Sequence, residues 1–373
     1  MRVRDATLLY QETQSSDAST KTIDLSLTDP ISALGFEFQA KNGTTSNRNN
    51  SLLKCITKIE IVDGSDALLS LSAEEIQALQ FYKTGKRPMM RDDESAAALY
   101  VAGMLVLFGR YLYDQEYALD LTKYRNPQLK ITWDLTKVSG ALNTTTTFAT
   151  GTFKISVWAK ILEGMPAPGK FLMAKEIDSW TGATSGDKRK ELPADFPYRL
   201  VMLQTYKSGN DIRENITKVK MTCDTDKFIP FERDMFEWDE EMAQLFGNVV
   251  IWKRAFASND DDIYLPVNRE PQVQFTKDGN AGLRGYDVGS NYCWSGLVNI
   301  YVCDTSGGAY TSDQKIMCLI EGHALHDTQP IPMGDLARPE TWFDPTPYKK
   351  VELVLTEAAA AANKIVLEQV RPN

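Results

Sequence analysis

Apolar and polar residues alternate along much of the chain. In these segments every second side chain is apolar and most residues between are polar, which is the pattern of a strand with one face on the core and one in water. Gly, Asn, Asp and Pro residues separate the segments, as expected for strands joined by turns. The pattern predicts an all-β protein built from antiparallel sheets. The clearest segments are Ile23–Leu27, Phe36–Ala40, Leu129–Trp133, Phe153–Ile161 and Val351–Leu355.

One segment has the features of a helix instead. Ser72, with Glu75 three residues later, matches the capping box that begins many helices. Ile76 and Leu79 then supply an apolar face, and Gly85 can adopt the left-handed conformation that ends a helix. The sequence therefore predicts a short helix that follows one of the first strands.

The chain contains four pairs of similar segments in the same order: strand, helix, strand, strand. The repeat is much longer than the roughly 20–50 residues of a solenoid unit, so it indicates a duplicated domain. The spacing between partners falls after the second pair, which predicts a longer insertion in the first copy, within Lys86–Asn126. The pairs are 56–61 with 216–221, 74–79 with 240–245, 127–132 with 271–276, and 151–155 with 296–300.

The composition between and around the two copies predicts the domain boundaries. The segment 164–169 combines Gly and Pro in the manner of a short, semi-rigid linker. It separates a first domain at 20–163 from a second at 170–373. Residues 1–19 are polar after Tyr10 and are interpreted as an arm outside the core. The end of the chain, Lys349–Val370, is interpreted as a hairpin.

Charge and hydropathy exclude several classes of protein. Lys and Arg number 41 against 50 Asp and Glu, a net charge of −9, which argues against a surface built mainly to grip nucleic acid. The longest apolar stretch, Ala96–Phe108, is shorter than the roughly 20 residues of a membrane-spanning helix. The start of the chain has no apolar core of a secretory signal. We therefore expect no sequence-specific nucleic-acid binding and no secretion.

The cysteines do not form a recognisable framework. Their number is odd and no C-x-x-C occurs, so neither a disulfide scaffold nor a zinc ribbon is predicted. We expect reduced and mostly buried thiols. The five residues are Cys55, Cys223, Cys293, Cys303 and Cys318.

Two glycine-rich segments resemble phosphate-binding loops only in part. Gly164 to Lys170 has the spacing of a P-loop, but Phe171 replaces the Ser or Thr that would bind Mg²⁺. Pro166 and Pro168 also lack the backbone N–H groups that such a loop uses. Residues 279–285 are interpreted as turns. Neither segment predicts a nucleotide site.

Other residue types allow weak alternatives to a purely structural protein. His323 and His326, the only histidines, could join a metal site with further ligands, and 260–262, all Asp, could help bind Ca²⁺. A polar turn and a solvated acidic loop are the simpler interpretations. Trp180, Trp294 and Trp342 are interpreted as packing residues, with sugar stacking as the alternative for one of them. We predict no catalytic, cofactor-binding or metal-binding residues.

Two tandem all-β domains, each with a helix after about the fourth strand and neither with a catalytic motif, resemble the double jelly-roll major capsid proteins of tailless icosahedral viruses. This lineage includes the tectiviruses and adenoviruses. The resemblance rests on Ile56–Gly85 with its echo at Ile216–Gly247, and on the later strand pairs. It implies two tandem eight-stranded antiparallel jelly rolls with a short helix in each.

The resemblance also implies a function and partners. Three chains would form a trimer of six rolls, a pseudo-hexagonal capsomer that tiles the shell of a virion assembled in the host cytoplasm. Lateral capsomer contacts and minor capsid or penton proteins would be the partners, and neither enzymatic activity nor a cofactor is implied.

The family's chain ends often reach the inner face of the shell, where some members cover a lipid membrane. Arg2, Arg4, Leu8, Leu9 and Tyr10 could make such a contact with anionic headgroups. The alternative is a disordered terminus.

Two other functions remain open at the level of sequence. One is a double β-sandwich protein that binds or hydrolyses glycans, which predicts a concave acidic cleft or an exposed Trp platform. The other is a different phage structural component, such as a tail or baseplate protein, which would not need an internal duplication.

Overall fold

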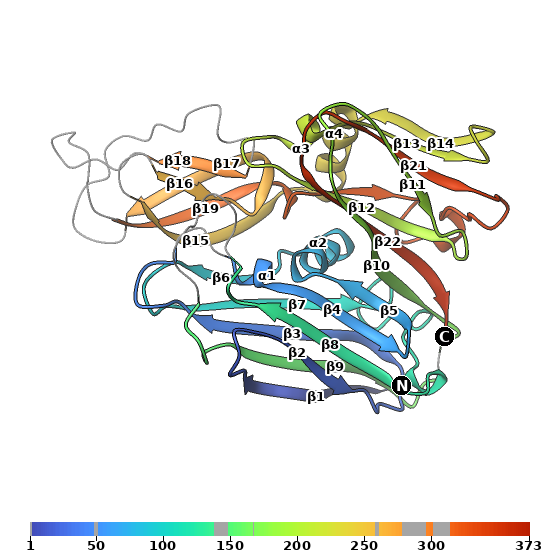
Figure 1. Ribbon diagram of the computed structural model, residues 1–373. Coiled ribbons are helices and arrows are strands. Elements are labelled where there is room, and N and C mark those ends of the chain that lie inside the picture. Colours follow the sequence, from blue (N-terminus) through green and yellow to red (C-terminus); the bar gives the residue numbers. More distant parts are fainter. Residues whose placement is uncertain are drawn as a thin grey trace.

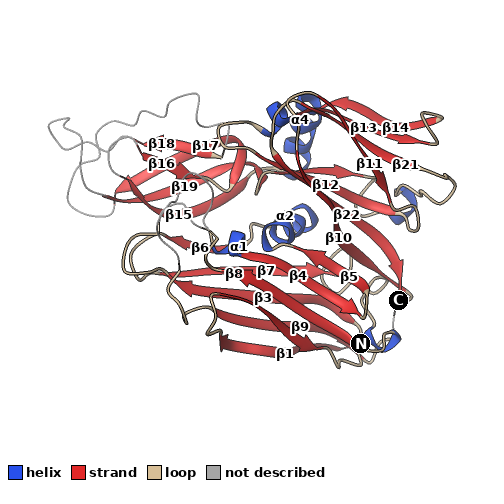
Figure 2. Ribbon diagram, in the orientation of Figure 1, coloured by secondary structure: helices blue, strands red, loops and turns tan. Residues whose placement is uncertain are grey.

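The computed structural model is mostly β-sheet, with a few short helices placed between the sheets (Figures 1 and 2). Two jelly rolls follow one another along the chain, as the sequence pattern predicts. The structure describes residues 2–47, 51–137, 148–166, 168–257, 261–277, 296–300 and 314–373.

The first roll has eight strands in two facing sheets. One sheet has the order β1-β9-β3-β7 and the other β2-β8-β4-β5, so consecutive strands mostly switch between sheets. This is the strand order of a jelly roll. Its elements are β1 (Arg2–Thr13), β2 (Ala18–Asp24), β3 (Ile31–Lys41), α1 (Leu52–Cys55), β4 (Ile56–Asp63), β5 (Asp66–Leu71), α2 (Ala73–Thr84), β6 (Met89–Asp93), β7 (Leu99–Leu107), a 3-10 turn (Leu121–Lys123), β8 (Pro127–Asp134) and β9 (Lys154–Glu163).

The second roll repeats this arrangement. Its sheets have the orders β10-β22-β12-β20 and β11-β21-β13-β14. The main strands and helices of the roll are β10 (Lys170–Thr181), β11 (Gly186–Leu192), β12 (Tyr198–Tyr206), α3 (Ile212–Asn215), β13 (Ile216–Cys223), β14 (Phe228–Asp234), α4 (Met235–Phe246), β20 (Thr328–Pro332), a 3-10 turn (Pro339–Thr341), β21 (Val351–Glu357) and β22 (Ala362–Pro372).

A strand-rich insertion separates α4 from β20. It extends the first roll's sheet by β15 and its neighbours, in the order β7-β6-β15-β19-β17. The corresponding segment of the first roll, between α2 and β7, holds only β6. The inserted strands are β15 (Val249–Ala257), β16 (Asp261–Tyr264), β17 (Val267–Lys277), β18 (Leu297–Ile300) and β19 (Gln314–Leu325).

The longer insertion is therefore in the second copy, and its predicted position in the first copy is wrong. The first two sequence pairs lie in corresponding elements, since 56–61 and 216–221 lie in β4 and β13, and 74–79 and 240–245 lie in α2 and α4. Within the helices the pairing is one turn out, because their equal lengths place 236–241 opposite 74–79. The last two pairs matched β8 and β9 with inserted strands instead of β21 and β22. The error has a physical cause, because alternating strands resemble one another whatever their place in a sheet.

The duplication extends to fine detail of the strand pairing. The register slips in β4 after Ile56, against β8, and in β13 after Ile216, against β21. It also slips at matching places in β1 against β9 and in β10 against β22. These shared irregularities show that the two rolls follow the same backbone plan.

The helices begin and end as their sequences dictate. In α2 the Ser72 side chain accepts from the Glu75 N–H while the Glu75 carboxylate accepts from the Ser72 N–H, which confirms the capping box. Gly85 ends the helix at φ 63°. In α4 Asp234 accepts from the Phe236 N–H. The two helices follow β5 and β14, the matching strands of the two rolls.

The structure at both ends of the chain differs from the arm and the hairpin that the sequence predicted. Residues 2–13, within the predicted arm, form β1, which pairs with β9 and whose side chains are mostly exposed. Near the other end, the two predicted strands exist, but they do not form the predicted hairpin. Strand β21 pairs with β11 and β13, and β22 pairs with β10 and β12, because the last two strands of a jelly roll belong to opposite sheets.

Candidate functional site

The two rolls meet along a junction in which two pairs of strands lie parallel. Strand β5 pairs with β10 through Leu69–Ala174 and Ser70–Lys175, and β6 pairs with β15 through Asp92–Lys253 and its neighbour. Helix α2 lies in the space between the rolls (Figure 1). The junction is therefore continuous sheet and packed helix rather than a flexible hinge.

A buried cluster of three charged side chains crosses this junction. Lys83, at the end of α2, and Arg199, on β12, both bind the carboxylate of Glu368 on β22. Each side chain is at most 2% exposed. Burial raises the pKa of Glu368, but the two cations more than offset this and hold it below its usual value. The carboxylate is thus a charged bridge between the rolls.

A second buried cluster joins β6 to the inserted strand β15. The Lys253 ammonium lies 3.0 Å from Asp92 Oδ2 and 2.8 Å from Glu94 Oε1, and all three side chains are at most 5% exposed. Burial raises the pKa of Asp92 to about 6. Outside the cluster, Arg254 binds Asp93 at 3.0 Å. These pairs fix the position of the insertion against the first roll.

Neutral and titratable groups complete the junction around α2. His326 Nε2 lies 2.9 Å from Gln77 Oε1, and the Tyr82 hydroxyl donates to the Thr328 carbonyl at 2.5 Å. Burial lowers the pKa of His326 to about 4, so this imidazole is neutral at pH 7. Burial likewise raises the pKa of Glu75, which faces Lys364 at 3.1 Å, to about 7.

This chemistry suits a structural role. The charges in the two clusters are shielded from water and already have fixed partners, so they do not present a free acid, base or nucleophile to a substrate. Removing one member of such a cluster leaves the others buried without a partner, which is costly. The clusters therefore specify one relative position of the two rolls.

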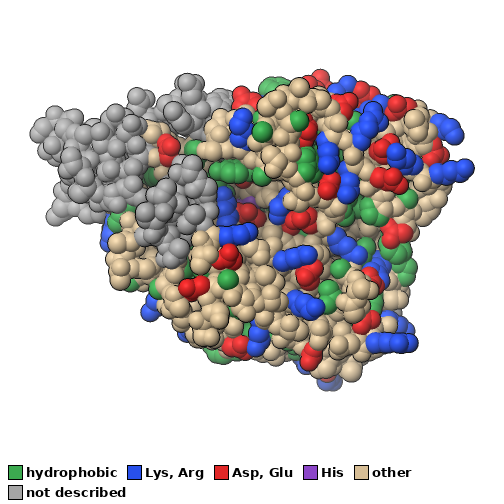
Figure 3. Space-filling model, viewed as in Figure 1, with side chains coloured by type: hydrophobic (Ala, Val, Ile, Leu, Met, Phe, Trp, Pro, Cys, Tyr) green, Lys and Arg blue, Asp and Glu red, His purple; other side chains and the backbone are tan. Residues whose placement is uncertain are grey.

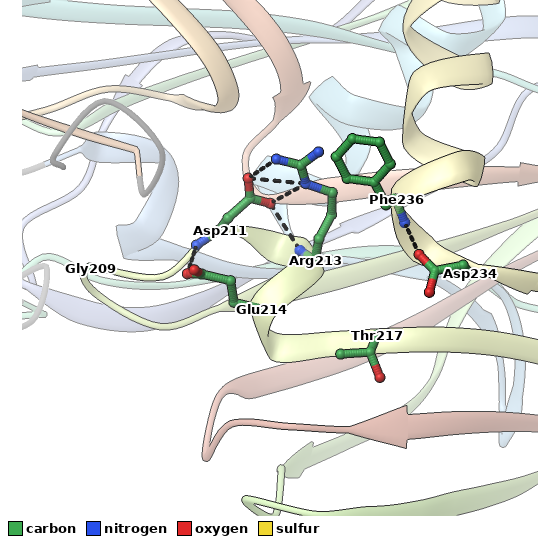
Figure 4. Close-up of a pocket in the computed structure, with 7 residues that line it drawn as sticks. All are labelled: Gly209, Asp211, Arg213, Glu214, Thr217, Asp234 and Phe236. Carbon is green, nitrogen blue, oxygen red and sulfur yellow. Dashed lines mark hydrogen bonds and ion pairs between the residues drawn. The ribbon is translucent and has the colours of Figure 1, made fainter. Parts of the chain in front are cut away.

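A surface pocket of about 670 Å³ lies on the second roll beside α3 and α4 (Figure 4). Its polar groups bind one another: Asp211 and Glu214 form a capping box, and Arg213 binds the Asp211 carboxylate. The Arg213 guanidinium also lies 4.5 Å from the centre of the Phe236 ring. These contacts account for the pocket residues as helix caps and surface packing.

The residues predicted as weak metal or nucleotide candidates are scattered. His326 is buried in the junction, whereas His323 lies near the Gly247 carbonyl. Within the described parts of the chain, no three His, Cys, Asp or Glu residues are grouped to hold a metal ion. At the P-loop-like segment a strand, β10, begins at Lys170, where a phosphate loop would need a helix.

The aromatic and sulfur candidates are partly accounted for. Trp342 is buried, and the Trp180 N–H donates to Glu357 Oε1 at 2.6 Å. Cys55, Cys223 and Cys318 are buried free thiols, as expected. Burial raises the pKa of Cys55 to about 12, so it stays a thiol at neutral pH. The remaining candidates, Trp294, Cys293, Cys303, residue 260 and 279–285, lie outside the described residues.

The five candidate residues for an inner-face contact lie on β1, but they do not share one environment. Leu8 and Leu9 are partly buried and pack against the core. Arg4 lies 3.6 Å from Asp29 and 3.8 Å from Glu163. Arg2 is exposed, and Tyr10 is 74% exposed near the other end of the strand.

The surface carries charges of both signs. On the face shown in Figure 3, Lys and Arg side chains are interspersed with Asp and Glu over the second roll. None of the helices in the described ranges is both long enough and apolar enough to cross a membrane. Exposed large apolar side chains are few, and two of them, Phe236 and Leu245, lie on α4.

Sequence reasoning did not find the junction residues, although a signal for them exists. Glu368 and Lys253 each follow directly after a run of apolar residues within a strand, at 365–367 and 249–252. A charged residue inside an apolar strand needs a buried partner. The partner itself comes from the other roll and could not be identified without the fold.

The class of fold is thus a double jelly roll with a rigid junction between its halves. The sequence matches no family model and no curated protein. Solved structures of several capsid proteins do match it over nearly its whole length.

Three of these structures illustrate the likeness. The major capsid protein of Sulfolobus turreted icosahedral virus is 10% identical with a TM-score of 0.59, and the match covers 99% of this chain and 96% of that one. Capsid protein P2 of bacteriophage PM2 is 9% identical with a TM-score of 0.51, covering 99% and 97%. The PBCV-1 capsid protein is 11% identical with a TM-score of 0.53, covering 99% and 93%. The likeness confirms the predicted fold.

Proposed function

We propose that this chain is the major capsid protein of an icosahedral virus. The observation that carries the proposal is the match of both rolls, over 99% of the chain, to capsid proteins of the same architecture. The rigid junction supports it, because a shell subunit needs a fixed shape more than it needs a reactive site. We infer that the protein acts through its shape and edges and not as an enzyme.

In this proposal three chains assemble into a capsomer with six rolls. A duplicated domain lets a threefold trimer fill a position with nearly sixfold surroundings in a shell. Weak lateral contacts between capsomers then add up over the closed shell. Minor capsid and penton proteins would complete the virion, and assembly would take place in the host cytoplasm.

Imaging of the purified protein tests this function. Negative-stain electron microscopy should show particles with a hexagonal outline, and raised protein concentration should give flat hexagonal lattices or closed shells. Single, elongated particles at all concentrations would contradict a capsomer.

A second proposal concerns a contact between the N-terminal strand and a lipid membrane inside the shell. Figure 1 places the two chain ends close to each other at one end of the molecule. Since Leu8 and Leu9 already pack against the core, the contact would rest mainly on the exposed Arg2, with Arg4 and Tyr10 in support.

Flotation with vesicles that contain anionic lipid tests the membrane contact. The wild-type protein should float with the vesicles at low salt, and Arg2→Glu should reduce the floating fraction. Lys86→Glu, an equal change of charge at an exposed site after α2, serves as the control. Equal flotation of all three proteins would refute the contact.

A glycan-active double sandwich is not favoured. The capsid proteins described above match nearly the whole chain with TM-scores above 0.5. Of the three tryptophans considered, Trp180 and Trp342 have packing or hydrogen-bond partners in the protein.

A further inference from the structure

The two rolls leave matching strand edges open. Within the chain β5 of the first roll pairs with β10 of the second. The counterparts of these strands are β14 and β1, because they hold the same places in the sheet orders of the opposite rolls. Among the described strands, β14 has only β13 as a neighbour and β1 only β9. One backbone edge of each is therefore available for pairing.

We propose that a second copy of this chain docks on these edges and repeats, between copies, the junction that joins the rolls within one chain. Strand β14 of one copy would lie parallel to β1 of the next, with α4 covering the outer face of the next copy's first roll. This inference rests on the proposed capsid function and assigns the contact within the capsomer.

Helix α4 has an exposed face at the positions that α2 buries in the internal junction. Both helices run for 12 residues from a capping residue to a glycine, so Lys83 of α2 corresponds to Leu245 of α4, and Glu74 to Phe236. The Lys83 side chain is 1% exposed in the internal junction. Leu245 is 63% exposed and Phe236 is 55% exposed. An apolar helix face at these positions is explained if another roll covers it.

The surface that would receive α4 is complementary in charge. On α4, Glu237 and Glu241 are exposed beside the apolar residues. In the internal junction α2 lies against β22, and β9 is the strand of the first roll that corresponds to β22. Lys154 and Lys160 lie on the half-exposed face of β9. Opposite charges around an apolar centre favour docking in one orientation.

The shared registers predict which residues face each other across the new contact. On β5, Ser70 lies opposite Glu60 of β4; at the corresponding position of the second roll, Glu232 of β14 lies opposite Lys220 of β13. On β10, Lys175 lies opposite Leu367 of β22; at the corresponding position of the first roll, Ala6 of β1 lies opposite Ala159 of β9. The list of counterparts is therefore Ser70 with Glu232 and Lys175 with Ala6. The internal pair Ser70–Lys175 thus becomes Glu232 of one copy opposite Ala6 of the next.

The contact is heterologous, since β14 meets β1 and not another β14. Such contacts give closed rings or open filaments, depending on the angle between copies. A closed ring of three chains would alternate internal and external junctions around one axis, which is the arrangement of the proposed trimer.

Substitution on α4 tests the docking surface. Leu245→Glu adds a charge at a site that is exposed in the single chain, so the chain should still fold with the wild-type circular dichroism spectrum and unfolding midpoint. Its trimer should dissociate at a concentration at least about tenfold higher than that of wild type, as for a central interface residue. Tyr111→Glu, at a side chain that is 57% exposed and belongs to neither α4 nor β1, is the control and should leave the trimer unchanged.

Crosslinking tests the register. Strand neighbours lie about 4.8 Å apart, within reach of a disulfide or a short bis-maleimide. The double variant Ala6→Cys with Glu232→Cys should give covalent dimers and three-chain rings. Ala6→Cys with Asp226→Cys, in the turn before β14, should give neither.

The outcomes separate this inference from the proposed function. A trimer that survives Leu245→Glu and fails to crosslink through Ala6→Cys with Glu232→Cys would refute this docking while leaving the capsomer intact. Such a result would mean that a different surface joins the copies. A wild-type chain that stays monomeric at all concentrations would refute both.

Discussion

Replacement of Glu368 by Gln tests the role of the buried charges in the junction. The substitution keeps the shape of the side chain, so it creates no cavity and removes only the negative charge. Lys83 and Arg199 would then stay buried as two cations without their common carboxylate. Breaking a buried ion pair in this way typically costs about 3–5 kcal/mol. We expect a loss of stability in this range or above it.

Denaturant unfolding, followed by tryptophan fluorescence and circular dichroism, measures the loss. Glu116→Gln is the matched control, because it removes the same charge from a side chain that is 65% exposed beside Arg110 and should leave the unfolding midpoint unchanged. Adding Lys83→Met to Glu368→Gln should recover part of the loss, since one of the two stranded cations is then absent.

The proposed role of the Glu368 carboxylate is refuted if Glu368→Gln and Glu116→Gln unfold at the same denaturant concentration. In that case water reaches the cluster, or the rolls are held by their strand pairs alone. It is also refuted if Lys83→Met deepens the loss caused by Glu368→Gln.

Three further predictions follow from local geometry. Gly35→Ala should cost about 1–3 kcal/mol of stability in a thermal melt, because a Cβ at Gly35 would lie 2.2 Å from the Trp158 ring. Gly169→Ala is the control and should be neutral, because a Cβ at Gly169 would have no other atom within 4 Å. Asp327→Asn should flatten the pH dependence of stability between pH 4 and 7. Burial raises the pKa of Asp327 to about 7. The contribution of this carboxyl group to stability is therefore present at low pH and is lost as the pH rises through 7. An equally steep pH profile for the variant would contradict this. A protease site placed in 164–169, the proposed linker between the two domains, should be cut without separating the two fragments on gel filtration. The β5–β10 pairing and the Glu368 cluster should hold the rolls together after cleavage. Separated fragments would show that the linker is needed.

Much of the fold could be predicted because its signals are local. Alternation identified β3, β8, β9 and β21, and the Ser72–Glu75 capping box identified α2. The match of 56–61 with 216–221 pointed to the duplication, since the two strands have similar sequences.

The errors arose where the answer depends on long-range pairing. The alternation of 271–276 on β17 looks like that of 127–132 on β8, yet β17 belongs to the insertion and β8 to the roll. Residues 2–13 are polar and exposed along most of β1, as an arm would be, yet their backbone pairs with β9. Which strand lies beside which is decided by contacts far apart in sequence.

The candidate site was the least predictable part. The junction clusters consist of ordinary Lys, Arg, Asp and Glu residues, and only the fold brings Lys83 to Glu368 and Lys253 to Asp92. The exposed residues Phe236 and Leu245 likewise acquire a meaning only when α4 is compared with α2.

The solution mass of the purified chain shows whether three copies form the proposed capsomer. The chain has a mass of 41.9 kDa, and the account predicts a stable species of three chains, about 126 kDa, by light scattering coupled to gel filtration. A single species at 41.9 kDa over the accessible range of concentration would contradict the account.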